Sequence, residues 1–148
     1  MAKNLHELKQ VHRLSTIISH DFKMNTGRIF QSSQFMQPTD GEPIRSVVTE
    51  SKDAVVVAWH IQPGQEIPAH IHPNGQDTWT ILSGTGDYYL DHAGATKPIS
   101  AGDVVIAPMG FVHGVLNHGD EPLVFISVVS PAEAGYQLVA SDPVAVDG

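Results

Sequence analysis

Two histidines and an aspartate lie close together in the stretch HIHPNGQD, residues 70–77. Imidazole nitrogens and carboxylate oxygens are groups that bind divalent transition metals in proteins. The chain contains no cysteine, which excludes thiolate metal sites, disulfides and a cysteine nucleophile. Any metal that the chain binds must therefore sit on nitrogen and oxygen.

The elements around this stretch are predicted to be short strands. From about Gly27 onward, β-branched and aromatic runs alternate with Gly, Pro, Asn and Asp, which is typical of a sheet protein with tight turns. Between Gly27 and Val129 no stretch of about ten or more residues shows the periodicity of a helix. Crossover helices, and with them a parallel sheet, are therefore not expected. Many short antiparallel strands must close into a barrel or a two-sheet sandwich to bury a core. The sequence therefore predicts an all-β fold, with its first strand at residues 27–30.

Composition limits the number of domains and the kinds of partner. A chain of 148 residues has the size of one domain, and its formal net charge of -8 argues against nucleic acid or an anionic membrane surface as a partner. No apolar run is long enough for a signal peptide or a transmembrane segment, so a soluble, cytoplasmic protein is expected. We expect residues 1–26 to form a helical or flexible extension and residues 27–148 to form the barrel.

Two blocks of the sequence resemble the two signature motifs of the cupin superfamily. The first block, GQEIPAHIHPNGQDTWTILSG, runs from residue 64 to 84, and the second, GDVVIAPMGFVHGVLN, runs from residue 102 to 117. They have the order and spacing that the family shows, and the resemblance covers roughly residues 44–129. Cupins are small jelly-roll β-barrels, so the resemblance implies a single jelly-roll barrel.

In cupins, two histidines and the acid of the first motif join the histidine of the second motif around one metal ion. Carried over position by position, this implies His70, His72, Asp77 and His113 as metal ligands. Strand geometry agrees, because residues i and i+2 project to one face and an antiparallel strand can bring His113 across the cavity. The family usually has glutamate where this chain has Asp77, whose side chain is one methylene shorter. Asp77 can bind directly, bind through a water or be replaced by Gln76. We favour Asp77, because Gln76 faces the opposite side of a regular strand.

The implied ligands restrict the metal and suggest its chemistry. Three imidazoles and a carboxylate suit one divalent transition ion (Fe, Mn, Ni, Co or Zn), whereas calcium and magnesium prefer oxygen ligands. Such an ion can polarise a carbonyl or enediolate oxygen, lower the pKa of bound water or bind dioxygen beside a chelating substrate. The resemblance therefore implies a metal-dependent enzyme acting on a small oxygenated metabolite, of dioxygenase, isomerase, or decarboxylase or lyase type. Asp77 would tune the charge of the ion and serve as acid or base.

Two other readings of the same residues stay open. One is a non-catalytic module that binds a small sugar or acid in the same metal cavity. The other is a metal-free barrel whose histidines are vestigial. A barrel of this kind hosts many functions, so fold alone does not choose among them.

Alternation along the strands places further residues. If Asp77 faces inward, Trp79 and Ile81 share its face, so Trp79 is placed to wall a substrate pocket and Ile81 to fill the core. His60 ends an apolar run and can face either the cavity or the outside. Three further residues are expected to complete an apolar lining: Met109, Phe111 and Phe125.

The resemblance also bears on assembly. Single-domain cupins often pair, which implies a homodimer built from the strands ahead of the first motif, such as the run IRSVVTE at residues 44–50. The expected partners are thus a second copy of the chain and a small-molecule ligand or substrate.

Overall fold

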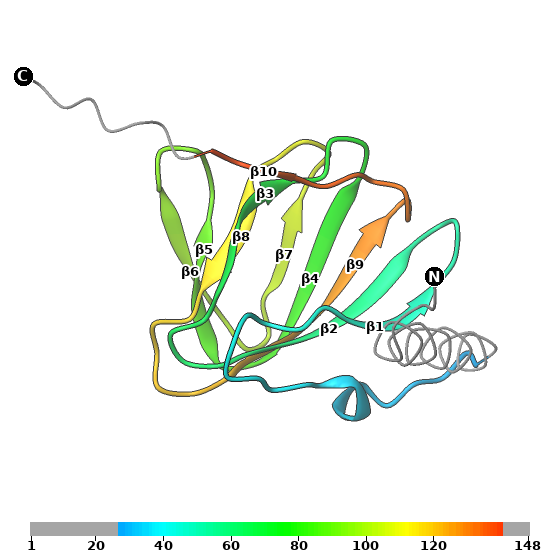
Figure 1. Cartoon of the computed structure of the whole chain (residues 1–148), viewed down its shortest axis with the longest axis horizontal. Coiled ribbons are helices and arrows are strands. Elements are labelled where there is room, and N and C mark those ends of the chain that lie inside the picture. The colour runs from blue at the N-terminus through cyan, green and yellow to red at the C-terminus, as the bar shows by residue number, and fades with distance from the viewer. Residues whose placement is uncertain (1–26, 141–148) are drawn as a thin grey trace, which may run out of the picture. The chain divides into compact units, whose positions relative to one another are not determined.

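The computed structural model describes residues 27–140, and its strands all lie between residues 46 and 138 (Figure 1). The extension predicted for residues 1–26 lies outside the described residues. In the described part, one 3-10 turn, η1 (Ser32–Phe35), precedes the strands. No helix there is long and apolar enough to cross a membrane. The strands are β1 (Ser46–Glu50), β2 (Val55–Ile61), β3 (Glu66–Ile71), β4 (Gln76–Ser83), β5 (Thr85–Tyr89), β6 (Thr96–Ser100), β7 (Val104–Ala107), β8 (His113–Leu116), β9 (Leu123–Ser130) and β10 (Gln137–Leu138).

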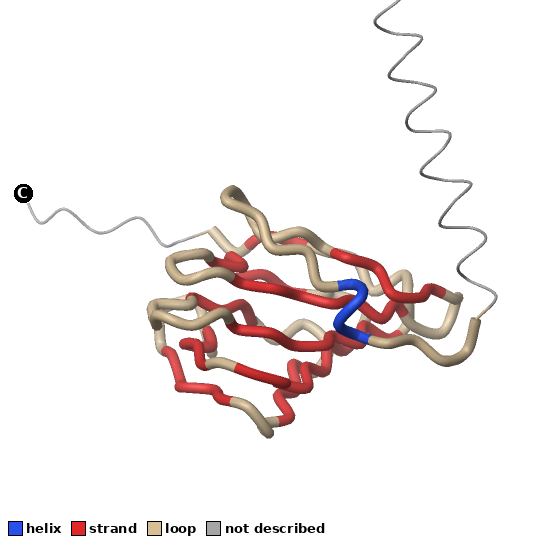
Figure 2. Tube along the Cα trace, turned by 90° about the horizontal axis from the view of Figure 1, so that it is seen from below, coloured by secondary structure: helices blue, strands red, loops and turns tan. Residues whose placement is uncertain are grey.

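The strands form two antiparallel sheets. One sheet has the order β1-β2-β9-β4-β7 and the other has the order β10-β3-β8-β5-β6, as far as the described residues show. Strands far apart in sequence are neighbours, because β9 pairs with both β2 and β4. Figure 2 shows that strands and connecting loops make up nearly all of the described chain, with η1 as its helical turn. The all-β jelly-roll prediction is confirmed.

The core lies between the two sheets, and buried and exposed residues alternate most regularly in β4 and β9. In β9 every second residue from Leu123 to Val129 is buried, and in β4 the buried residues are Asp77, Trp79 and Ile81. Each large apolar side chain removed from water in this way contributes about 1.5–3 kcal/mol to stability. The central apolar cluster draws on both sheets and contains Ile61, Ile67, Trp79, Ile81, Tyr88, Ile99, Val115, Leu123 and Phe125.

Two local expectations were wrong. Residues 27–30 form no strand, and Ile29 is almost fully exposed, because no strand in the described chain pairs with this segment. Met109 and Phe111 do not line the interior, since 63% and 60% of their surfaces are exposed. They flank Gly110 in a turn closed by a hydrogen bond from the Phe111 amide to the Pro108 carbonyl oxygen, and the tip of such a turn faces solvent.

Gly84 joins β4 to β5, and we expect Gly84→Ala to lower the free energy of unfolding. Its φ of +82° disfavours any side chain, and an added Cβ would lie within 2.1 Å of the Pro122 carbonyl oxygen. Left-handed strain costs about 1–3 kcal/mol, and the clash adds to this cost. Gly94→Ala is the matched control, because φ is +89° there but nothing lies near the added Cβ. Urea unfolding should show a clearly larger loss for Gly84→Ala, and equal losses would contradict the packing described.

Candidate metal centre

The two sheets each contribute to one polar group in the interior. His70 on β3 and His113 on β8 are direct partners across the antiparallel ladder, so their rings start from adjacent positions. In a regular strand Ile67 and His70 would face opposite sides, because they are three positions apart. An irregularity in the pairing between them allows Ile67 and His70 both to be buried. Asp77 enters from β4 in the opposite sheet. The group therefore bridges the two layers of the barrel.

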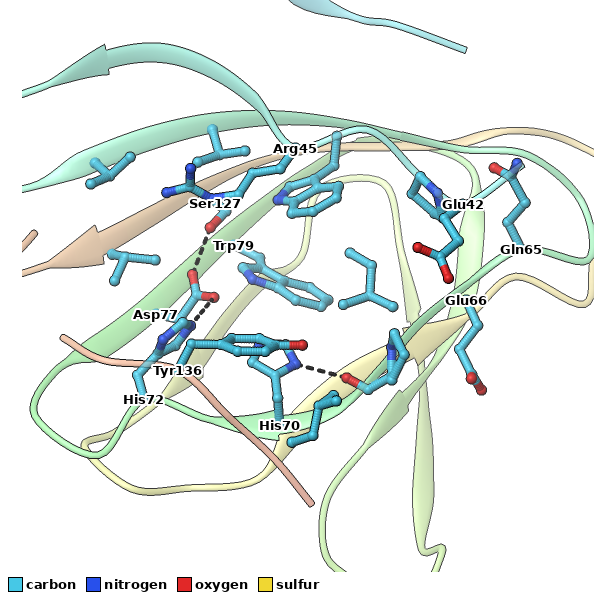
Figure 3. Close-up of a pocket in the computed structure, with 18 of the residues that line it drawn as sticks. Glu42, Arg45, Gln65, Glu66, His70, His72, Asp77, Trp79, Ser127 and Tyr136 are labelled. Atoms are coloured by element: carbon cyan, nitrogen blue, oxygen red, sulfur yellow. Dashed lines mark hydrogen bonds and ion pairs between the residues drawn. The ribbon is translucent and has the colours of Figure 1, made fainter. Parts of the chain in front are cut away.

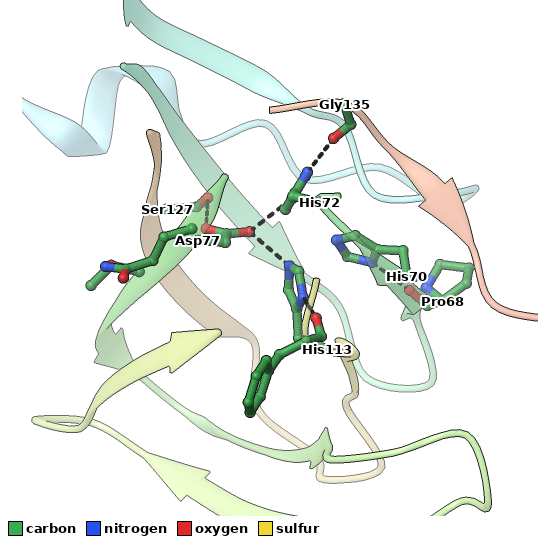
Figure 4. A network of polar contacts seen from close by, with 10 residues as sticks. Pro68, His70, His72, Asp77, His113, Ser127 and Gly135 are labelled. Carbon is green, nitrogen blue, oxygen red and sulfur yellow. Dashed lines mark hydrogen bonds and ion pairs between the residues drawn. The ribbon is translucent and has the colours of Figure 1, made fainter. Parts of the chain in front are cut away.

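His72 completes this group from just beyond the end of β3. The expectation that it shares a face with His70 agrees with the structure, where the two ring centroids are 5.2 Å apart. The ring of His113 is 4.1 Å from that of His70 and 5.0 Å from that of His72. Figure 4 shows the rings of His72 and His113 directed toward the carboxylate of Asp77, with the ring of His70 beside them.

Backbone hydrogen bonds determine the tautomer of each imidazole. A carbonyl oxygen only accepts, so an Nδ1 atom bound to one must carry the proton and donate it. Each neutral ring is thereby oriented with the lone pair of its Nε2 free, which is the arrangement that metal-binding histidines use. The Nδ1 to carbonyl pairs are His70 with Pro68 (2.7 Å), His72 with Gly135 (2.7 Å) and His113 with Phe111 (3.0 Å).

Acceptor atoms consequently face one another inside the group. Oδ2 of Asp77 is 3.1 Å from Nε2 of His113 and 3.4 Å from Nε2 of His72. With neutral rings, these atoms present lone pairs to one another, so their approach is favourable only with a proton or a metal cation between them. The ligand atoms of the four residues all lie within 4.8 Å of one another. The donor set therefore fits a divalent transition ion, and His70, His72, Asp77 and His113 form a group that could hold one.

The electrostatics of the group favour an ionised Asp77 and a neutral His70. Burial, reinforced by the neighbouring His113, lowers the pKa of His70 to about 4. Burial would raise the pKa of Asp77, but hydrogen bonds with His113, His72 and Ser127 hold that pKa well below its usual range. Burial would likewise lower the pKa of His72, but the hydrogen bonds to Asp77 and Gly135 together raise it. At neutral pH Asp77 is thus an anion and His70 a neutral base.

The structure also places the alternative ligand. Gln76 is exposed, and its Nε2 donates to Thr78 Oγ1 at 3.1 Å, away from the imidazoles. Asp77 is buried, and its Oδ1 accepts a hydrogen bond from Ser127 Oγ at 2.7 Å, which orients Oδ2 toward the histidines. The shorter aspartate therefore still reaches the group, and Gln76 does not.

Three members of the group, His70, His72 and Asp77, line a cavity of about 1020 Å³ (Figure 3). Trp79 lines this cavity, in agreement with the expectation from strand alternation. His60 does not line it, because His60 alternates along β2 with the lining residue Trp59 and so faces the other side of the sheet. Phe125 belongs to the core and stacks on Trp79 with ring centroids 4.3 Å apart.

Two lining residues close to the metal group were not predicted. Tyr136 lies over the imidazoles, with its ring centroid 5.0 Å from that of His70. It precedes β10, which pairs with β3 and carries this segment across the cavity. Arg45 comes from the segment just before β1 and also lines the cavity. The sequence carried no motif for either residue, because both positions depend on contacts between distant segments.

Acidification is expected to weaken metal binding through His72. A proton on Nε2 competes with the metal, and the raised pKa of His72 makes it a ring that holds its proton to higher pH than usual. Below that pKa the affinity should fall about tenfold per pH unit for each proton displaced, and above it the affinity should level off. His70 should not compete, because its pKa of about 4 keeps it neutral. Calorimetric titration with Mn²⁺ from about pH 5 to 8 measures this dependence, and a flat profile would contradict it.

Comparison with known proteins agrees with the fold and with the two motifs. A family model described as "Cupin domain" matches residues 57–129. The crystal structure of an uncharacterized conserved protein with a double-stranded β-helix domain from Klebsiella pneumoniae subsp. pneumoniae is 51% identical. It has a TM-score of 0.74, and the match covers 77% of this chain and 98% of that one. An RmlC-like cupin protein from Desulfovibrio desulfuricans is 28% identical with a TM-score of 0.59, over 65% of this chain and 89% of that one.

These findings describe a jelly-roll barrel in which both motifs contribute to one polar group. The chain belongs to the cupin superfamily. Among curated proteins, Germin-like protein 5-1 of Oryza sativa subsp. japonica is 37% identical over 94 residues, which is 58% of this chain and 42% of that protein. The chain thus matches less than half the length of this relative.

Proposed function

We propose that this cupin is a metal-dependent enzyme acting on a small oxygenated metabolite, by a reaction of dioxygenase, isomerase, or decarboxylase or lyase type. One observation carries the proposal: the ligand atoms of His70, His72, Asp77 and His113 lie within 4.8 Å of one another, and all of these residues except His113 line a cavity large enough for a metabolite. When bound there, one divalent transition ion (Fe, Mn, Ni, Co or Zn) supplies a Lewis acid beside the substrate.

The chain's own residues would divide the work as follows. The Nδ1 hydrogen bonds of the three histidines hold their rings in place before any ligand binds, which reduces the entropy lost on binding. Ser127 fixes one oxygen of Asp77 and leaves the other toward the site. Because its pKa is held low, Asp77 is ionised at neutral pH and can accept a proton but has none to donate. We propose Asp77 both as a ligand and as the catalytic proton acceptor.

Metal content followed by a turnover screen tests this proposal. Protein purified without added metal should hold about one transition-metal equivalent per chain by mass spectrometry of the elements. The metal-loaded protein is then screened against chelating acids, diketones, keto acids and sugars, with oxygen uptake and NMR of the mixture as readouts. Turnover that follows the metal content supports the enzyme. A metal-free preparation with unchanged stability would support a vestigial site and overturn the proposal.

A non-catalytic module that binds a small sugar or acid is the second candidate. The low pKa of Asp77 favours it, because a carboxylate so strongly stabilised as an anion is a weak base. The other members of the group are imidazoles whose free nitrogens all face the metal position, so they offer no separate base. Saturable binding of a metabolite by the loaded protein, without turnover of that metabolite, would favour this candidate.

We also propose that the protein is a homodimer, as the family resemblance implies. In the described chain β1 lies at the end of its sheet and pairs with one strand, β2, so its other edge has no strand partner there and a second copy can pair with it. Light scattering during gel filtration should give about twice the chain mass of 16.0 kDa. A monomer mass would contradict the proposal. The cytoplasmic location stays a prediction from the sequence.

A further inference from the structure

The indole N–H of Trp79 is a buried donor that has no acceptor. Trp79 is 2% exposed and lines the cavity, and its Nε1 has no hydrogen-bond partner. An indole N–H can only donate, and a buried donor left unpaired is costly. The ring stands beside the metal group, with its centroid 6.0 Å from that of His113. Because Nε1 itself is buried, an acceptor atom on a bound molecule satisfies this donor once the indole ring shifts toward the cavity.

The guanidinium of Arg45 is a second free donor group in the cavity. Among the described residues that line the cavity, Arg45 is the one lysine or arginine, and it forms no ion pair. A guanidinium offers paired donors that match the two oxygens of a carboxylate.

The cavity is polarised along its length. Figure 3 shows the Arg45 side chain at the end that holds Asp77 and Ser127, with Glu42 and Glu66 at the opposite end. Asp40 also lines the cavity, and like Glu42 it belongs to the segment before β1. A ligand is therefore met by the guanidinium of Arg45 beside the metal group and by carboxylates without a cation at the far end.

We infer that the molecule bound at the metal site is a monocarboxylic acid whose carboxylate is held by Arg45 and by the indole N–H of Trp79. The inference rests on the proposed function and adds the substrate class to it. The carboxylate satisfies the free donors at one end, and the remainder of the molecule extends toward the far end. That remainder carries neutral hydroxyl groups, because the carboxylates there would repel a second acid group and can accept hydrogen bonds from hydroxyls.

Three polyols of the same six-carbon chain test this inference: glucitol with no carboxylate, gluconate with one and glucarate with two. Their binding to Mn²⁺-loaded protein is followed by calorimetry and by tryptophan fluorescence, since both tryptophans line the cavity. Gluconate should bind at least about tenfold more tightly than glucitol, as expected for a charge-assisted contact, and more tightly than glucarate. Equal binding of gluconate and glucitol would overturn the inference. Tighter binding of glucarate than of gluconate would overturn the claim that the ligand carries neutral groups at the far end of the cavity.

Variants separate the contact with Arg45 from chelation by the metal. Arg45→Gln should bring gluconate to the affinity of glucitol, whereas Arg45→Lys should retain most of the preference. Because Arg45 is exposed and pairs with no acid, neither change should affect folding. Trp79→Phe, which keeps a ring and removes the N–H, should weaken gluconate severalfold with little change for glucitol. An unchanged gluconate affinity in Arg45→Gln would show that the metal alone binds the acid and would overturn the inference.

Metal content measured on the same samples keeps this test apart from that of the proposed function. Wild-type protein without a metal site would defeat the proposed function. Preferential gluconate binding that depends on Arg45 would still support the carboxylate contact in that case. Full metal content with no preference for gluconate would defeat the inference alone.

Discussion

His113→Ala protein is expected to lose its bound metal, with an affinity more than about 100-fold below that of the wild type. Loss of an outer hydrogen-bonding partner of a metal ligand already costs about 10–100-fold, and His113 is placed as a ligand itself. Its Nε2 faces Asp77 at 3.1 Å, and its ring is packed against that of His70. Elemental mass spectrometry of purified protein and calorimetric titration with Mn²⁺ measure the loss.

His118→Ala is the matched control for this prediction. His118 is also a histidine paired with an aspartate, Asp87, at 2.7 Å, but its side chain is 65% exposed and lies outside the metal group. Its replacement should leave the metal content unchanged. Because His113 is buried, thermal unfolding of both variants must show a folded protein at the temperature of the assay. Wild-type metal content in folded His113→Ala would rule out the proposed coordination.

Asp77→Asn is expected to weaken metal binding about 10–100-fold and to change the titration of His72 in the metal-free protein. The substitution keeps the size of the side chain and removes its charge. Burial lowers the pKa of His72, and the contacts with Asp77 and Gly135 together outweigh that effect. Without the carboxylate, His72 should lose its proton at a lower pH than in the wild type. NMR of the imidazole protons as a function of pH measures this shift.

Asp77→Glu separates the effect of the side chain's charge from the effect of its length. Glutamate is the residue that cupins usually have here, and it retains the carboxylate. The variant should keep its metal within about tenfold, since only the reach of the side chain and its hydrogen bond with Ser127 change. An unaltered His72 titration in Asp77→Asn, or equal metal loss in the Asn and Glu variants, would contradict the role given to the charge.

Much of the barrel could be predicted because the relevant signals are local. Alternation of buried and exposed positions in β4 and β9 follows from neighbouring residues, so the inward face with Asp77, Trp79 and Ile81 could be derived from the sequence. The motif pair led to the four residues that the structure brings together. The choice between Asp77 and Gln76 also followed from strand alternation.

The remainder of the cavity depends on contacts between segments far apart in sequence. Tyr136 lies over His70 because β10 pairs with β3, and a two-residue strand has no periodicity to detect. Arg45 lines the cavity from the segment before β1, outside both motifs. The exposure of Met109 and Phe111 depends on the turn around Gly110, in which apolar residues point to solvent although their type suggests burial.

Anomalous X-ray diffraction from crystals of the wild-type protein, grown without added metal, tests the central claim most directly. Data collected at the absorption edges of Mn, Fe, Co, Ni and Zn should show one peak about 2.0–2.3 Å from Nε2 of each of the three histidines, next to Oδ2 of Asp77. The edge at which the peak appears identifies the ion. A structure with no peak among these atoms, or with the ring of His113 turned away from the other two, would contradict the account.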